Sequence, residues 1–130
     1  MIDHYTLLVR DYARSKAFYT TVLEPIGYGL VVELTRETVK SLGVPVTCGF
    51  GTNKPDLWIA PSEGEIAPTH IAFLAASRAE VDAFHRTALA AGGRDNGPPG
   101  VRAYYHPNYY GAFILDPDGY NIEAVCHSGE

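Results

Sequence analysis

The sequence predicts an α+β fold made of two βαβββ modules, whose curved mixed sheets surround a shared cleft. Two observations carry this prediction. His4 and His70 each open a strand-like segment and lie 66 residues apart, and Phe18 and Phe84 in the helical segments that follow have the same offset. Each half also runs from a strand through a helix into shorter strands. Because two copies are too few for an open solenoid, we expect the two modules to close on each other.

The composition is that of one globular domain, with 46% hydrophobic and 19% charged residues in a chain of 130. We expect module one at 1–60, a linker at 61–69 and module two at 70–130. A net charge of -5 without a Lys/Arg cluster excludes nucleic acid and anionic membranes as partners. The absence of a signal-like or membrane-length apolar run predicts a cytoplasmic protein. Cys48 and Cys126 form no CxxC pair, which is typical of reduced structural thiols.

The first module reads as one strand, one helix and three shorter strands. Residues 2–9 are strand-like, and Asp11 can cap a helix that runs to about Leu23. Pro25 and Gly27 then end this helix. Three short apolar runs bounded by Gly and Pro are predicted strands: Leu30 to Leu34, Val46 to Phe50 and Leu57 to Ala60.

The second module repeats this order. Residues 69–75 are strand-like, Ser77 followed by Glu80 forms a capping box, and Gly92 is the predicted end of the helix. The Gly/Pro-rich passage that follows carries no predicted strand. A hairpin closes the chain around the turn sequence DPDG, with predicted strands at 109–115 and 120–125.

Strand alternation places His4 and His70 on the sheet faces that look away from the helices, and Glu123 on the corresponding face of the last strand. Any one of these side chains alone is explained as a satisfied polar group. Together they make a three-ligand site for a divalent metal, with positions left for water or substrate. Zn, Fe(II), Mn and Ni all fit this set. Three sequence neighbours are candidates to orient the imidazoles: Asp3, Thr6 and Thr69.

The strand-opening "DH" and "TH" and the segment "FILDPDGYNIE" resemble the vicinal oxygen chelate superfamily. That superfamily contains glyoxalase I, extradiol dioxygenases, bleomycin-binding resistance proteins and fosfomycin-resistance thiol transferases. The resemblance implies a homodimer and a metal that chelates adjacent substrate oxygens. It also puts His4, His70 and Glu123 at the ligand positions. Glyoxalase I carries a fourth ligand, a glutamate, where alignment of the two modules here gives Trp58. Phe113 stands roughly where the dioxygenases carry an acid–base tyrosine.

The segment "YYHPNYYG" supplies the catalytic candidates. His106 could act as an acid or base, and a tyrosine hydroxyl could donate to a substrate oxygen; of Tyr104, Tyr109 and Tyr110, we select Tyr110. The alternative is a turn at Pro107 flanked by packed tyrosines. Outside this segment, Trp58 could stack on a planar ligand, but packing is the favoured interpretation. Arg10 and Arg102 could bind an anion, but a surface position is favoured for both. His85 is expected in solvent by its helical spacing, and no functional role is predicted for His127.

The leading hypothesis is therefore a metal-dependent enzyme, a lyase or dioxygenase, that acts on a small oxygenated organic substrate through Lewis-acid chelation. The alternative is a protein like the bleomycin-binding resistance proteins, which sequesters a hydrophobic or aromatic compound without turning it over.

Overall fold

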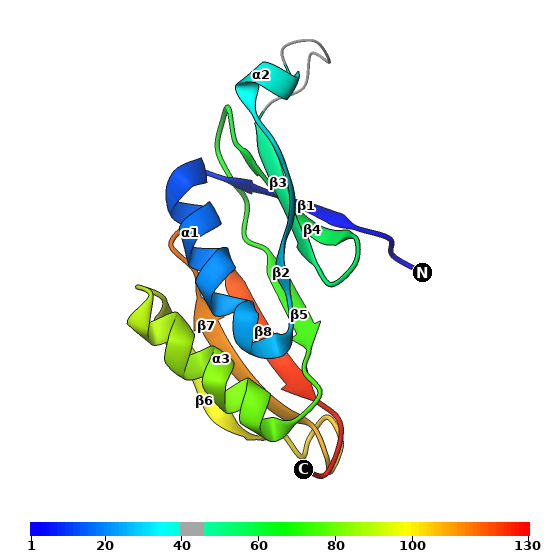
Figure 1. The fold of residues 1–130 in the computed structure, drawn as a ribbon. Helices are drawn as coiled ribbons and strands as arrows, with labels where there is room; N and C mark the ends of the chain where they lie inside the picture. The colour runs from blue at the N-terminus through cyan, green and yellow to red at the C-terminus, as the bar shows by residue number, and fades with distance from the viewer. Residues whose placement is uncertain (40–45) are drawn as a thin grey trace.

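The computed structural model of the protein describes residues 1–39 and 46–130 and contains two four-stranded sheets and two long helices (Figure 1). The first module comprises β1 (Tyr5–Val9), α1 (Tyr12–Val22), η1 (Glu24–Ile26), β2 (Gly29–Leu34), α2 (Arg36–Val39), β3 (Thr47–Gly51) and β4 (Pro55–Pro61). The second comprises β5 (His70–Leu74), α3 (Arg78–Ala90), β6 (Arg94–Val101), β7 (Tyr110–Leu115) and β8 (Asn121–Cys126).

The two sheets have the same topology, which confirms the predicted repeat. Their strand orders are β1-β4-β3-β2 and β5-β8-β7-β6, and the first pair of each sheet is parallel while the others are antiparallel. Thr6 pairs with Trp58 across β1 and β4, as Ala72 pairs with Glu123 across β5 and β8. The predicted alignment of Trp58 with Glu123 is therefore confirmed.

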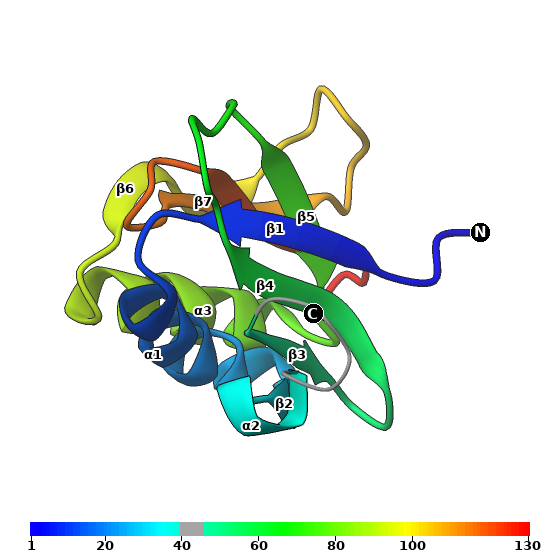
Figure 2. The same cartoon turned by 90° about the horizontal axis from the view of Figure 1, so that it is seen from above.

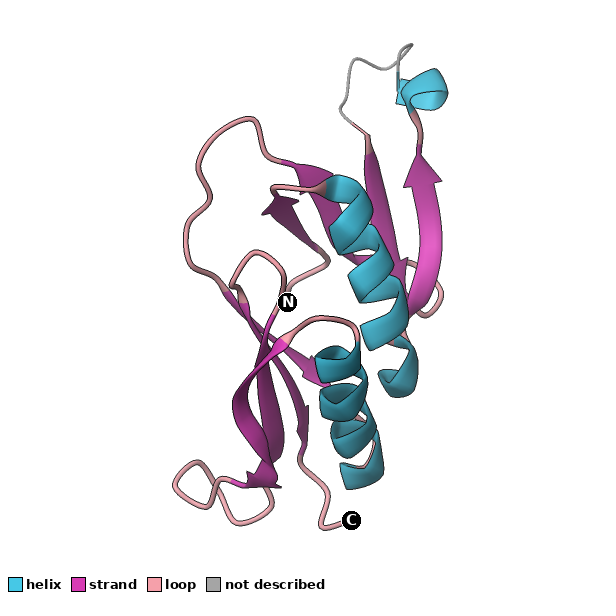
Figure 3. Cartoon of the chain, turned by 90° about the vertical axis from the view of Figure 1, so that its left-hand side faces the viewer, coloured by secondary structure: helices cyan, strands magenta, loops and turns pink. Residues whose placement is uncertain are grey.

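Both helices lie side by side on one side of the molecule, and the sheets form the other side (Figures 2 and 3). The predicted strand faces follow from this layering. Leu7 and Phe73 are buried toward the helices, whereas Leu8 and Leu74 on the opposite faces are 48% and 69% exposed. Each large apolar side chain buried in this layer contributes about 1.5–3 kcal/mol to the free energy of unfolding. The helices thus cover one face of each sheet and leave the other open.

Helix caps follow the sequence prediction. The Asp11 carboxylate accepts a hydrogen bond from the backbone N–H of Arg14 at 3.0 Å, and the Ser77 hydroxyl accepts one from Glu80 N–H at 3.2 Å. The Glu80 carboxylate reaches back to the N–H of Ala76 at 2.7 Å, one residue before the cap itself. These contacts satisfy backbone donors that a helix N-terminus leaves unpaired.

The DPDG turn of module two is joined to helix α1 by side-chain hydrogen bonds. The Asp116 carboxylate is buried, accepts the backbone N–H groups of Asp118 and Tyr120, and receives the Tyr19 hydroxyl at 2.5 Å. Burial raises the pKa of this carboxyl group. The Arg14 guanidinium also contacts Asp118 at 3.1 Å. The most characteristic motif of the sequence therefore joins the two modules.

Some expectations were wrong. The Gly/Pro-rich passage forms β6, although its pairing with β7 is interrupted by register shifts. His85, expected in solvent, is buried and its Nε2 lies 2.9 Å from the Asp95 carboxylate on that strand. The first strand begins at Tyr5 rather than Ile2, so His4 precedes it. Across residues 1–39 and 46–130, the helices are too short or too polar to cross a bilayer.

Candidate functional site

The open face of the second sheet holds a buried carboxylate. Glu123 lies on β8 and is 1% exposed, although its strand face looks away from the helices. One oxygen lies 3.1 Å from His70 Nε2, and the other accepts a hydrogen bond from the Tyr109 hydroxyl. A Cβ at position 111 would lie 3.1 Å from this second oxygen, so Gly111 leaves the space that the carboxylate needs. In the part of the chain that is described, no lysine or arginine forms an ion pair with Glu123.

His70 opens β5, and its hydrogen bonds define how its ring is protonated. Its Nδ1 lies 2.9 Å from the backbone carbonyl oxygen of Asn121. Because a carbonyl can only accept, Nδ1 must carry the proton. In a neutral imidazole, Nε2 then presents a lone pair toward Glu123. A carbonyl that fixes the tautomer in this way is the usual support of a metal-binding histidine.

His4 is held in a similar way at the start of module one. Its Nδ1 lies 2.7 Å from the Asp3 carboxylate, which accepts the proton and leaves Nε2 available as a ligand. The hydrogen bond from His4 and the positive charge of Lys54 lower the pKa of Asp3. Both histidines thus have a protonated Nδ1 and an unprotonated Nε2 when neutral. Asp3, predicted to orient His4, does contact it.

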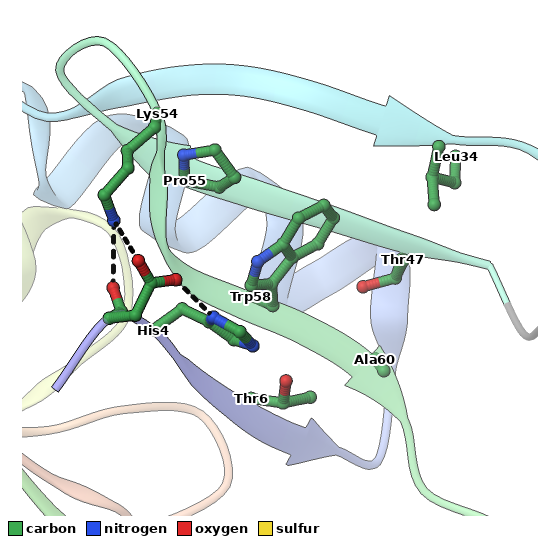
Figure 4. Close-up of a pocket in the computed structure, with 9 residues that line it drawn as sticks. His4, Thr6, Leu34, Thr47, Lys54, Pro55, Trp58 and Ala60 are labelled. Carbon is green, nitrogen blue, oxygen red and sulfur yellow. Dashed lines mark hydrogen bonds and ion pairs between the residues drawn. The ribbon is translucent and has the colours of Figure 1, made fainter.

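His4 borders a hollow of about 480 Å³ on the open face of the first sheet, where Trp58 forms the floor (Figure 4). A Cβ at position 49 would lie 3.2 Å from the indole ring, so Gly49 allows the ring to lie against β3. Leu34 and Ala60 add apolar surface, and Thr6 lies between His4 and Ala60 in this view. The hollow suits a flat, largely apolar group.

The structure brings His70 and Glu123 together but does not bring His4 into the same group. His4 and His70 line a second hollow where the modules meet, together with Tyr28 and Asp56. Within residues 1–39 and 46–130, no three His, Cys, Asp or Glu side chains lie close enough to hold one metal ion. A single chain therefore supplies a two-ligand arrangement at His70 and Glu123.

Neither of the two predicted catalytic residues contacts His70 or Glu123. The Tyr110 hydroxyl donates to Asp82 of α3 at 2.6 Å, on the helix side of the sheet. His106 Nε2 lies 2.8 Å from Nδ1 of the exposed His127. The neighbouring Tyr109, a weaker candidate in the sequence, is the tyrosine that reaches Glu123.

The strand register explains which tyrosine faces Glu123. Phe113 lies directly opposite Glu123 on β7, so residues that differ from 113 by an even number share its face. Residue 109 meets this condition and residue 110 does not. The position of each tyrosine relative to residue 113 can be counted in the sequence, and this count predicts that Tyr109 faces Glu123. Burial and the adjacent Glu123 carboxylate raise the pKa of Tyr109, so its hydroxyl keeps its proton at neutral pH.

Comparison with known proteins agrees with this architecture. The model of the Glyoxalase/Bleomycin resistance protein/Dioxygenase superfamily matches residues 1–124. A glyoxalase/bleomycin resistance protein from Albidiferax ferrireducens T118 superposes with a TM-score of 0.76 at 27% identity, over 97% of this chain and 98% of that one. No curated protein matches the chain.

The fosfomycin resistance protein FosX from Listeria monocytogenes shares the fold, with a TM-score of 0.69 at 20% identity over 98% of this chain and 93% of FosX. A mutant of FosX, complexed with Mn(II) and 1S,2S-dihydroxypropylphosphonic acid, gives 0.68 at 20% identity over 96% and 90% of the two chains. The match of the family model to nearly the whole chain decides the assignment. This chain belongs to the Glyoxalase/Bleomycin resistance protein/Dioxygenase superfamily.

Proposed function

We propose that the protein is a metal-dependent enzyme that acts on a small oxygenated organic substrate. The divalent metal would be held by His70 and Glu123 of one chain and by His4. The observation that carries the proposal is the contact at 3.1 Å between Nε2 of the half-exposed His70 and the buried Glu123 carboxylate. The family membership of the chain and the Mn(II) in FosX support it.

The contact between His70 and Glu123 requires a proton or a metal cation between the two groups. With Nδ1 protonated by its bond to Asn121, a neutral His70 directs a lone pair at the carboxylate, and the two groups repel. Either a proton is shared between the two groups, carried by His70 or by Glu123, or a cation binds to both. A buried carboxylate without a cation loses several kcal/mol of hydration free energy, and a dication offsets that loss. One nitrogen and one carboxylate oxygen match the ligand types that Zn, Fe(II), Mn and Ni accept.

The third ligand is proposed to be His4 of the partner subunit. The open faces of both sheets carry exposed apolar side chains, with Leu8 and Leu74 at equivalent positions. In a two-fold homodimer, module one of each chain can cover module two of the other, because the two modules have the same topology. Such pairing buries both open faces and carries an oriented imidazole to the His70–Glu123 pair.

The residues around this pair have separate roles. The metal would supply Lewis-acid polarisation of the substrate oxygens. The Tyr109 hydroxyl retains its proton and donates a hydrogen bond to Glu123, so it would orient this carboxylate. Phe113 forms an apolar wall opposite Glu123. Trp58, aligned with Glu123, offers no fourth carboxylate, so the reaction is that of a three-ligand lyase or dioxygenase. The roles predicted for His106 and Tyr110 stay predictions.

Metal analysis tests the proposal. Protein stripped with a chelator and reloaded with Mn(II) or Zn(II) is expected to bind about one ion per chain. His70→Ala should abolish binding, because it removes a ligand. His127→Ala is the matched control, since His127 is an exposed histidine outside the pair, and should load normally. Equal loading of the His70→Ala variant and the wild type would contradict the proposal, as would a wild type that binds no metal.

The hollow beside Trp58 favours a second candidate function, sequestration of an aromatic compound. Trp58 is the only tryptophan in the sequence, so its fluorescence reports occupation of this hollow alone. Metal-free protein that binds 1-naphthol at micromolar concentration with quenching of Trp58 would support this function. Unchanged fluorescence up to millimolar 1-naphthol would exclude it.

A further inference from the structure

We propose that Arg102 forms an anion-binding subsite on the open face of the second sheet, so that the substrate is an organic anion. The substrate part of this inference rests on the proposed function, whereas the subsite itself needs no metal. The sequence predicted a surface position for this arginine, and three features of the structure assign it a role.

The first feature is a glycine-lined seat that fixes the guanidinium. Nη1 of Arg102 donates to the carbonyl of Gly100 at 2.9 Å, and Nη2 donates to the carbonyl of Pro98 at 2.8 Å. A Cβ at position 100 would lie 3.1 Å from Nη1, and one at position 97 would lie 3.2 Å from Nη2. Gly97 also has a φ of +148°, which side chains rarely adopt. The guanidinium is therefore held in place before any ligand arrives.

The second feature is an unmatched charge. No carboxylate in the described part of the chain pairs with Arg102. The same is true of Arg94, but of these two residues only Arg102 has its guanidinium fixed by backbone carbonyls. The chain holds 15 acidic residues against 10 Lys and Arg, so partners are not scarce. A guanidinium has five N–H donors, and the two carbonyls use two of them. The remaining donors can bind a carboxylate or another oxyanion.

The third feature is the position of Arg102 relative to the candidate metal ligands. Its guanidinium carbon lies 5.4 Å from the centre of the Phe113 ring, and the His70 ring stacks on Phe113 at 6.1 Å. The strand order β5-β8-β7-β6 places Phe113 between His70 and the strand that leads to Arg102. A small molecule lying across Phe113 can direct its oxygens toward His70 and Glu123, and its anionic group toward Arg102. Its apolar body then contacts the phenyl ring.

NMR titration of metal-free protein with benzoate, and with the neutral benzamide, tests the subsite. Benzoate should shift the Arg102 Nε–H and Gly100 N–H signals saturably, and benzamide should not. Arg102→Gln should weaken benzoate binding by about tenfold or more, because it removes a charged donor. Arg94→Gln removes the same charge from an exposed position at the start of β6, the strand that leads to Arg102, and should bind as the wild type does.

Arg102→Lys keeps the charge but loses the planar donors, and decides the matter if the glutamine variant does not fold. Its benzoate binding should be weaker than that of the wild type. Equal shifts by benzoate and benzamide, or wild-type affinity in both Arg102 variants, would overturn the subsite. A wild-type protein that binds benzoate but no metal would overturn the proposed function alone. A wild-type protein that binds metal but no benzoate would overturn this inference alone.

Discussion

Replacing Glu123 with glutamine is expected to abolish stabilisation by metal while leaving the metal-free fold almost as stable as the wild type. Glutamine has the same shape, so its oxygen can still accept the Tyr109 hydroxyl and its amide can donate to His70 Nε2. Glu123 is 1% exposed, so the substitution also removes a buried charge. The free energy gained in this way offsets the weaker hydrogen bonds of glutamine. We therefore expect the free energy of unfolding of the metal-free protein to change by less than about 1 kcal/mol.

The loaded protein should behave differently. At a metal concentration about 100 times Kd, binding stabilises the wild type by about 2.7 kcal/mol, which raises Tm by roughly 10 °C in a domain of this size. If loss of the Glu123 charge weakens metal binding by about a hundredfold, the same metal concentration stabilises the variant by less than about 0.5 kcal/mol.

Differential scanning calorimetry with and without Mn(II) or Zn(II) measures both quantities. Equal metal-induced shifts in Tm for the Glu123→Gln variant and the wild type would refute the ligand role. A loss of more than about 3 kcal/mol in the metal-free variant would show that Glu123 is a structural residue.

Two further predictions concern the fold around the site. Tyr19→Phe removes the donor to buried Asp116 and should lower the free energy of unfolding by about 1.5–3 kcal/mol in urea denaturation; a loss below about 0.5 kcal/mol would contradict the role of this bond in joining the modules. Hydrogen bonds from Lys54 and Tyr28 lower the pKa of Asp56, so its stabilising contribution is present above the ordinary value of 3.8 and is lost as pH falls through the lower folded value. Tm should therefore fall less steeply between about pH 5 and about pH 2 in Asp56→Asn than in the wild type, and equal slopes would contradict this assignment.

The sequence was sufficient for the architecture because hydrophobic alternation is a local pattern and the repeat is visible when the two halves of the chain are aligned. The offset shared by His4 and His70 predicted two modules with the same topology, and strand parity predicted which faces the helices cover. Caps such as Asp11 also depend on residues three positions apart, so they were predictable.

What the sequence missed depends on contacts between distant segments. The segment RDNGPPGV has the composition of a loop, and it forms β6 because β7 pairs with it and glycines accommodate its register shifts. Without that strand, the partner of His85 was not evident and the residue was assigned to solvent. Tyr109, rather than the predicted Tyr110, contacts Glu123 because it shares the strand parity of Phe113 across the hairpin. The Arg102 seat likewise depends on backbone positions that composition does not reveal.

The sequence also does not predict whether His4 meets His70 and Glu123 of the same chain or of a second chain. Residues at equivalent positions of two modules can meet within one chain or between two, and the same periodicity predicts both. In this structure His70 and Glu123 meet, while His4 with its Asp3 partner remains available on the open face of the other module. Under the proposed function, a second chain completes the site.

Mixing two defective chains tests that requirement most directly. His4→Ala and Glu123→Gln homodimers are each expected to bind no metal. After co-refolding, about half of the dimers should be mixed, and each mixed dimer has one complete site, so about one quarter of all sites should load. Metal analysis of the dimer peak from size-exclusion chromatography gives this fraction. Loading near one quarter is the predicted result, and mixed dimers that bind no metal would contradict a site shared between subunits.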